Sequence, residues 1–310
     1  MMKVLIVASF NKNHYAPFIE EQAIALEELN CKIEWFGLQG KGMWGYLKNL
    51  SALKKKISET HPDVVHAHYG LSGLLANLQR RVPVVTTYHG SDINDHKALR
   101  FSKIAMKLSA WNIFVSQKTM DIAQPKKHYS LLPCGIDLCD AQMTEKSEAR
   151  RKMKMNDKKK YVLFAGAFDN AVKNAPLAKA AVALMQDDNV ELLELKGYSR
   201  EEVALLMCAA DTFLMTSFTE GSPQVVKEAM ACGCPIVSVD VGDVKERVNG
   251  IDACYVAETR EPQVLAELMK KAMSFEGKAN GREKILDEGL DNRHVAKQLM
   301  AIYEQVTDSL

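Results

Sequence analysis

The stretch that decides the fold is Asp211–Val239, which reads DTFLMTSFTEGSPQVVKEAMACGCPIVSV. Two short apolar runs, Thr212–Thr216 and Pro235–Val239, enclose a segment of helical character, Pro223–Cys232. Short apolar runs on either side of a helix are typical of parallel strands that are covered by helices on both faces. We therefore predict a strand, a loop, a helix, a turn and a second strand in this order.

The loop before this helix has the chemistry of an anion-binding site. Ser222 is a good N-cap residue, and Pro223 suits the first helical position because an N–H group would have no partner there. Gly221 allows a ligand to approach the backbone closely. Since unpaired N–H groups and the helix dipole attract negative charge, we expect a phosphate group at this helix N-terminus.

Two acidic residues flank the expected phosphate. Glu220 directly precedes Gly221, and Glu228 lies inside the helix, about a turn and a half from its start. A carboxylate beside a phosphate is useful when it accepts hydrogen bonds from hydroxyl groups, as a sugar or a ribose offers. The spacing alone also fits a second interpretation, in which both residues are ordinary acids that the helix dipole stabilises.

The same alternation of strands and helices extends outward along the chain, and it predicts doubly wound parallel sheets. The other expected strands are Val4–Ala8, Lys32–Phe36, Val64–Ala67, Val84–Thr87, Asn112–Val115, Tyr161–Ala165 and Val190–Glu194. The expected helices include Leu47–Thr60, Gly73–Arg80, Ala175–Met185, Arg200–Ala209 and Asn292–Thr307.

Length and composition favour two α/β domains. A chain of 310 residues is typical of about two domains, and it needs no disulfide or metal to stabilise its core. A polar stretch, Asp140–Lys160, separates two halves of similar pattern, and we place the boundary near its start. The N-terminal domain is then 1–140 together with a C-terminal helix at about 292–310, and the C-terminal domain is 141–291.

Charge and composition exclude several classes of protein. The 40 Lys+Arg balance 39 Asp+Glu, which argues against a nucleic-acid binder. Seven cysteines without a paired CxxC pattern indicate reduced thiols. No apolar run reaches the length of a membrane span, and MMKVLIVASF is too short for a signal peptide, so we expect a cytoplasmic protein. The first strand lacks a following GxGxxG, which leaves a nicotinamide or flavin site without support.

Asp211–Val239 resembles the E-x7-E region of retaining glycosyltransferases with the GT-B fold, family 4 in particular. The shared pattern is S-x-x-E-G-x-P-x-x-x-x-E-A-M-A-x-G-x-P, and it begins at Ser217. The resemblance implies two facing Rossmann-like domains, whose parallel sheets are covered by helices, and a last helix that crosses back to the N-terminal domain. It also implies that Glu220 contacts the hydroxyls of the donor sugar and that Glu228 binds the ribose. The diphosphate would be held by the amides of Gly221 and Ser222, directly before Pro223 at the helix start.

Three more segments extend the resemblance. Gly166, followed by Lys173, is similar to the segment whose lysine neutralises the donor phosphates, although Ala167 replaces the usual arginine. His89 matches the N-domain histidine that faces the donor sugar across the cleft. Tyr198 falls where the nucleobase pocket usually forms.

The resemblance implies a retaining, hexosyltransferase-type glycosyltransferase of enzyme class 2.4. The sugar would pass from a UDP- or GDP-sugar to a glycan or lipid-linked acceptor in the synthesis of a surface polysaccharide or glycoconjugate. No cofactor and no metal are expected besides this co-substrate, because GT-B enzymes stabilise the diphosphate with helix N-termini and Lys or Arg. Two alternatives stay open: a catalytically inactive GT-B subunit that supports a partner transferase, and a nucleotide-sugar epimerase.

Two further patterns have competing interpretations. His66 and His68 lie on one face of a strand, but no third ligand follows by spacing, so we expect a scaffold role and no metal. Basic residues recur at helical spacing beside an apolar stripe and predict either a solvated helix face or a peripheral contact with the inner membrane face. Residues 1–140 carry 17 Lys+Arg against 12 Asp+Glu, whereas residues 141–310 carry 23 against 27, and this asymmetry favours the N-terminal domain for such a contact. The basic residues are Lys97, Arg100, Lys103 and Lys107.

Overall fold

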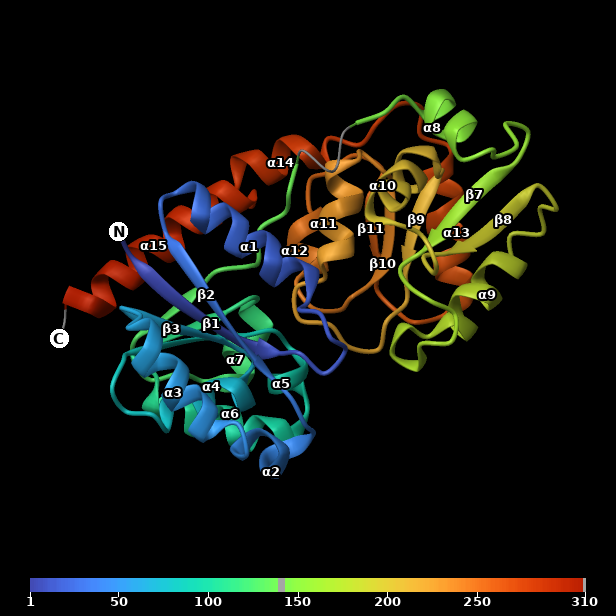
Figure 1. Cartoon of the computed structure of the whole chain (residues 1–310). Coiled ribbons are helices and arrows are strands. Elements are labelled where there is room, and N and C mark those ends of the chain that lie inside the picture. The colour runs from blue at the N-terminus through green and yellow to red at the C-terminus, as the bar shows by residue number, and fades with distance from the viewer. Residues whose placement is uncertain (139–142, 309–310) are drawn as a thin grey trace. The chain divides into compact units, whose positions relative to one another are not determined.

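The computed structural model describes residues 1–138 and 143–308, which form two compact units (Figure 1). The first unit combines Met1–Gly135 with Asn292–Leu310, and the second is Ile136–Asp291. The predicted boundary, between residues 140 and 141, lies outside the described residues. Ile136 belongs to the second unit because its side chain packs in that unit's core.

The first unit is built on a six-stranded parallel sheet with the order β2-β1-β3-β4-β5-β6. Such an order, in which the chain reverses direction beside its first strand, is that of a doubly wound fold, as predicted. The strands are β1 (Lys3–Ser9), β2 (Lys32–Leu38), β3 (Val64–His68), β4 (Val84–Tyr88), β5 (Trp111–Phe114) and β6 (Tyr129–Leu131).

Helices cover both faces of this sheet (Figure 1). Alternate residues of β1 face opposite sides: Val4 and Ile6 pack with α1 and α15, while Leu5 and Val7 pack with α3 and α4. The helices are α1 (Pro17–Glu28), α2 (Gly42–Leu47), α3 (Leu50–Thr60), α4 (Gly70–Asn77), α5 (Ser91–Asn94), α6 (His96–Leu108), α7 (Gln117–Ala123) and α15 (Asn292–Asp308).

The C-terminal helix α15 returns to the first unit and forms part of its core, which confirms the crossing-back predicted with the fold. Val295 and Leu299 are buried against the β1 face, one turn apart. Further along α15, Tyr303 is fully buried, and its hydroxyl lies 2.6 Å from Nδ1 of His66 on β3. A polar contact therefore ties the end of the chain to the middle of the sheet.

The second unit has a five-stranded parallel sheet with the order β11-β10-β9-β7-β8. Its strands are β7 (Lys160–Phe164), β8 (Val190–Glu194), β9 (Thr212–Met215), β10 (Ile236–Val239) and β11 (Tyr255–Ala257). Its helical segments are α8 (Lys146–Lys152), the 3-10 turn η1 (Ala171–Lys173), α9 (Ala175–Ala183), α10 (Arg200–Ala209), α11 (Gln224–Ala231), α12 (Val244–Val248), α13 (Pro262–Met273) and α14 (Gly281–Asp287).

The polar stretch Asp140–Lys160, in which we predict the domain boundary and no helix, contains α8. Arg150 on α8 is buried, and its guanidinium pairs with Asp211 at 2.8 Å and donates to the carbonyl of Ala209 at 3.1 Å. The high charge of this stretch does not predict α8, because the partners of the buried Arg150, Asp211 and Ala209, are distant in the sequence. The single helix predicted over Leu47–Thr60 is shorter in the structure: α3 begins at Leu50, and Leu47 is the last residue of the separate helix α2.

No helix within residues 1–138 and 143–308 is both long enough and apolar enough to cross a bilayer.

Replacing Tyr303 with Phe tests the contact that anchors α15. The substitution removes a hydroxyl and leaves a buried nitrogen of His66 without its partner, so we expect the free energy of unfolding to fall by about 1–3 kcal/mol. Urea denaturation of the wild-type protein and Tyr303→Phe measures this difference. Tyr129→Phe is the matched control, because the Tyr129 side chain is 43% exposed. Equal stability of the two variants would contradict the anchoring role.

Candidate functional site

The predicted donor-binding residues of the second unit gather at one edge of its sheet. The neighbouring strands β7, β9 and β10 end at Phe164, Met215 and Val239, and parallel strands place their carboxyl ends at the same edge. The loops that follow them carry Gly166, residues 216–223 and Gly242. This is the edge at which open α/β sheets bind ligands.

The loop after β9 is held from two sides. On one side, Thr216 Oγ1 donates to the carbonyl of Lys173 at 2.9 Å, and the N–H of Phe218 donates to the carbonyl of Val172 at 2.9 Å. On the other side, the Arg260 guanidinium donates to the carbonyls of Thr216 at 3.2 Å and Ser217 at 2.9 Å. These bonds fix the backbone directly before Glu220.

Lys173 and Glu220 form an ion pair at the centre of this edge. The Lys173 Nζ lies 2.8 Å from Glu220 Oε1, and the two side chains are only 19% and 17% exposed. The lysine stem runs across Gly166, where an added Cβ would lie 2.9 Å from Lys173 Cγ. A glycine is therefore needed at position 166 for the lysine to reach the glutamate.

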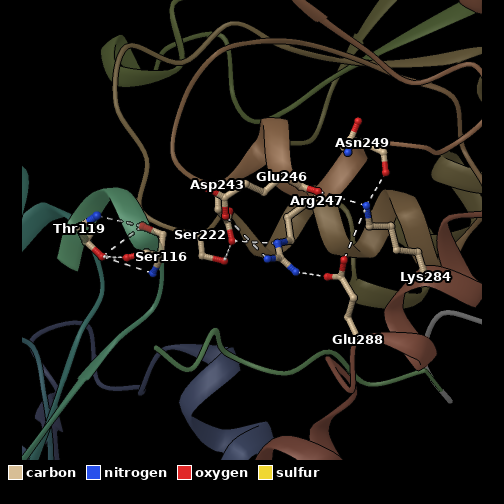
Figure 2. Close-up of polar contacts among 9 residues, drawn as sticks. All are labelled: Ser116, Thr119, Ser222, Asp243, Glu246, Arg247, Asn249, Lys284 and Glu288. Atoms are coloured by element: carbon tan, nitrogen blue, oxygen red, sulfur yellow. Dashed lines mark hydrogen bonds and ion pairs between the residues drawn. The ribbon is translucent and has the colours of Figure 1, made fainter. Parts of the chain in front are cut away.

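The start of α11 differs from the prediction. The helix begins at Gln224, with Pro223 in extended conformation at the N-cap position, and no side chain caps it. The Ser222 hydroxyl instead donates to Oδ2 of the buried carboxylate of Asp243 at 2.8 Å, and hydrogen bonds to an ionised acceptor are stronger than neutral ones (Figure 2). Within the described part of the chain, the backbone N–H groups of Gly221 and Ser222 have no protein acceptor, which leaves them available to an anion.

Glu228 occupies a desolvated position on α11. Burial raises the pKa of its carboxyl, while the positive charges of Arg200 and Lys227 oppose this shift. The Lys227 side chain is itself fully buried, so α11 brings a cation into the interior beside Glu228.

Within the described residues, Tyr198 makes no hydrogen bond with the Lys173–Glu220 ion pair. Its side chain is 41% exposed in the loop between β8 and α10, next to Ser199, which caps α10. Near Ala167, the position that lacks the usual arginine, Lys196 pairs with Asp169. Both members of that pair are more than half exposed, so the cation is accessible to solvent.

In the first unit, His89 directly follows β4 and is the centre of an aromatic cluster. Its Nε2 lies 3.0 Å from Nδ1 of His68, and its Nδ1 lies 3.7 Å from the sulfur of Cys134. The rings of Phe18 and Tyr69 contact it with centroid distances of 4.9 and 4.6 Å. Both ring nitrogens of His89 therefore face side chains of its own unit.

Asp92 holds the turn that carries His89. Its carboxylate is buried and accepts hydrogen bonds from the backbone N–H groups of His89, Gly90 and Gly70 at 2.8–3.0 Å. Burial raises the pKa of Asp92 to about 6, against the effect of these amide donors. The carboxylate thus links the turn after β4 to the start of α4.

His66 and His68 have partners that suit a structural role. The Nε2 of His66 lies 2.7 Å from Thr87 Oγ1, and burial lowers the pKa of this ring to about 3, which keeps it neutral. Burial also lowers the pKa of His68. Within the described residues, no group of three His, Cys, Asp or Glu side chains is placed to hold a metal ion.

Three residues at the second unit's edge were not found from the sequence: Asp243, Arg247 and Arg260. Asp243 binds Ser222, Arg247 pairs with Asp243, and Arg260 holds the loop after β9. The available signal was their position, since Asp243 and Arg260 each follow shortly after a strand of the parallel sheet.

Comparison with known proteins gives two family matches that together span both units. The sequence profile of the family described as glycosyl transferases group 1 matches residues 150–274, and that of glycosyltransferase family 4 matches residues 14–139. TuaC of Bacillus subtilis, assigned as a glycosyltransferase of teichuronic acid biosynthesis, is 26% identical over 250 residues, which is 72% of this chain. The chain spans 64% of the length of TuaC.

Solved structures share the fold. Sucrose-phosphate synthase of Thermosynechococcus elongatus superposes with a TM-score of 0.84 at 16% identity, over 100% of both chains. HepE of Anabaena, solved in complex with UDP and glucose, superposes with a TM-score of 0.73 at 18% identity, over 98% of this chain and 100% of its own. The predicted fold, with two parallel-sheet α/β domains, is confirmed.

Proposed function

Because the chain belongs to the group 1, family 4-like glycosyltransferases with the GT-B fold, we propose that it transfers a sugar from a nucleotide-sugar with retention of configuration. The observation that carries the proposal is the Lys173–Glu220 pair, which lies beside the unpaired N–H groups of Gly221 and Ser222. A cation, a carboxylate and backbone donors at one sheet edge match the three parts of a sugar diphosphate: charge, hydroxyl groups and phosphate oxygens.

In the proposed donor complex, Lys173 exchanges partners. Without ligand its ammonium is bound to Glu220 at 2.8 Å. A diphosphate at the loop amides would offer Lys173 a stronger acceptor, and the Glu220 carboxylate would then accept hydrogen bonds from the sugar hydroxyls. As the bond to the sugar breaks, negative charge develops on the diphosphate, and Lys173 with the loop amides would stabilise it.

The nucleoside would lie against the rest of the same edge. Glu228 is the proposed acceptor for the ribose hydroxyls, and the exposed ring of Tyr198 is the proposed surface for the base. The HepE complexes with UDP and with UDP-glucose support a uridine nucleotide as the first donor class to test. His89 stays the predicted catalytic residue of the first unit.

We propose a hexosyl donor and a glycan or lipid-linked acceptor, in the synthesis of a surface polysaccharide. The similarity to TuaC supports this acceptor class. An inactive, donor-binding subunit is the second candidate, and Ala167 favours it because the phosphate contact of an arginine is missing there. Both family profiles that match the chain describe glycosyltransferases, so they do not support the epimerase alternative.

Donor binding tests the site assignment. Removing the ammonium in Lys173→Ala or the carboxylate in Glu228→Ala deletes a charged hydrogen bond to UDP, and we expect each to weaken binding by about tenfold or more. Isothermal titration calorimetry with UDP measures the affinities. Lys245→Ala is the control, because Lys245 is an exposed lysine of the same unit. If both site variants bound UDP as tightly as the control, the assignment would be wrong.

Turnover of the donor separates the transferase from the inactive subunit. We expect the purified chain to hydrolyse its nucleotide-sugar slowly in the absence of acceptor, and to release the sugar with the anomeric configuration of the donor. Proton NMR of the first product, before mutarotation, reads this configuration in a panel of UDP- and GDP-sugars. UDP binding without turnover in any of them would favour the inactive subunit, and an inverted product would exclude retention.

We also propose that the first unit contacts the inner membrane face through α6. The exposed face of this helix carries Lys97, Arg100, Lys103 and Lys107, and Ile104 among them is 46% exposed. The buried positions of α6 are Ser102 and Ala105, so Ile104 is not part of the core. An apolar side chain within a basic stripe is the pattern of helices that lie on anionic lipid.

Vesicle sedimentation tests this contact. Each basic residue near an anionic surface contributes roughly 1 kcal/mol, so Lys103→Glu/Lys107→Glu should abolish most binding to phosphatidylglycerol vesicles. The wild-type protein should not sediment with phosphatidylcholine alone. Lys158→Glu/Lys245→Glu, a double reversal at exposed lysines of the second unit, should bind as the wild-type protein does. Equal sedimentation of both double variants would contradict the proposal.

A further inference from the structure

The loop after β10 supports the loop that carries the free amides. Gly242 has a φ of +55°, and an added Cβ would lie 2.6 Å from the carbonyl oxygen of Gly221. Both the backbone conformation and the lack of space require glycine here. The two loops are thus in direct backbone contact, although about twenty residues separate them in the sequence.

Asp243, the next residue, holds the side chain of Ser222. Its carboxylate is buried, with 2% of the residue exposed. The same oxygen, Oδ2, accepts the Ser222 hydroxyl at 2.8 Å and lies 3.3 Å from Nε of Arg247 (Figure 2). Because the single hydroxyl proton of Ser222 is used in this bond, Ser222 meets an anion with its backbone N–H.

Arg247 is fixed in turn by a chain of ion pairs (Figure 2). Its guanidinium pairs with Glu288, and Glu288 lies 3.6 Å from Nζ of Lys284 on α14. Lys284 also donates to the carbonyl of Glu246 on α12 at 3.2 Å. Residues of two helices, α12 and α14, therefore hold the partner of the Asp243 carboxylate in place.

The surroundings of Asp243 favour its ionised form over what burial alone would allow. Burial raises the pKa of Asp243, while the charge of Lys227, the Ser222 hydroxyl and Arg247 each act to lower it. An isolated buried carboxylate would repel a nearby phosphate. Here two cations, Lys227 and Arg247, offset that charge.

We propose that Asp243 is a positioning residue for the donor diphosphate: it holds Ser222 by its hydroxyl so that the N–H groups of Gly221 and Ser222 point to one anion. This inference rests on the proposed function, because it needs a diphosphate at the loop. Asp243 does not touch the ligand, and it acts through Ser222. Fixing the amides before the ligand arrives removes the cost of ordering them on binding.

A double-mutant cycle with UDP as the probe tests the proposal. In calorimetry, Ser222→Ala and Asp243→Asn should each weaken UDP binding by about tenfold, because the first removes the bond and the second replaces its charged acceptor with a weaker neutral one. The double variant should bind no more weakly than either single variant. Losses that multiply in the double variant would mean that the two residues act separately, and tighter binding by Asp243→Asn would mean that the carboxylate only repels the phosphate. Either result overturns the proposal.

Three controls keep the test decisive. Asp252→Asn removes a carboxylate from an exposed position in the same unit and should leave UDP affinity unchanged. Thermal unfolding of each variant shows whether Asp243→Asn remains folded; if it does not, Ser222→Ala alone decides, and unchanged affinity in that variant overturns the proposal. Failure of the wild-type protein to bind UDP would count against the proposed donor class instead, which separates the two claims.

Discussion

The parallel alignment of β7, β9 and β10 is the constraint on which the candidate site depends. Each strand pairs in register with its neighbour, so Phe164 lies beside Leu214, and Met215 beside Ser238. The loops that follow must then leave the sheet at the same edge, whatever their separation in the sequence. Two close approaches at this edge have space only because of the glycines at positions 166 and 242: the Lys173 side chain crosses Gly166, and the carbonyl of Gly221 lies against Gly242.

Two ion pairs with little solvent exposure lie at the edge of the second unit's sheet that carries the candidate site. Lys173–Glu220 and Arg247–Asp243 are both largely withdrawn from water, where an unpaired charge would be costly. Such pairs contribute little net stability compared with apolar packing, but they hold their groups in defined places. The two pairs differ in what a ligand can reach, since Asp243 is 2% exposed and the Lys173 side chain is 19% exposed. In the proposed donor complex the Lys173–Glu220 pair exchanges partners, and the Arg247–Asp243 pair stays in place.

The sequence predicts the elements of this edge better than it predicts their contacts. The α/β order and the stretch from Glu220 to Pro235 follow from local patterns, because strand and helix periodicity are local properties. The prediction that Ser222 caps α11 was wrong, because its hydroxyl bonds to Asp243 and not to the helix. No local spacing rule indicates so distant an acceptor. For the same reason the sequence predicts no helix within Asp140–Lys160: the charges of α8 look solvated until the pairing of Arg150 with Asp211 is known. Asp243 and Arg247 lie beyond the recognised motif, so only the strand order places them beside it.

The histidines of the first unit show the same dependence on long-range pairing. A neutral imidazole has one N–H and one lone pair, so at the 3.0 Å contact between His68 Nδ1 and His89 Nε2 one ring donates and the other accepts. Burial lowers the pKa of His68, which keeps that ring neutral and prevents it from donating through both nitrogens. The tautomers of the two rings are therefore coupled: a proton on His68 Nδ1 requires a lone pair on His89 Nε2, and the reverse. His66 is stacked on His68 at 4.4 Å and is bound to Tyr303, so the ring that sets the tautomer of His89 is itself held in place from the last helix of the chain.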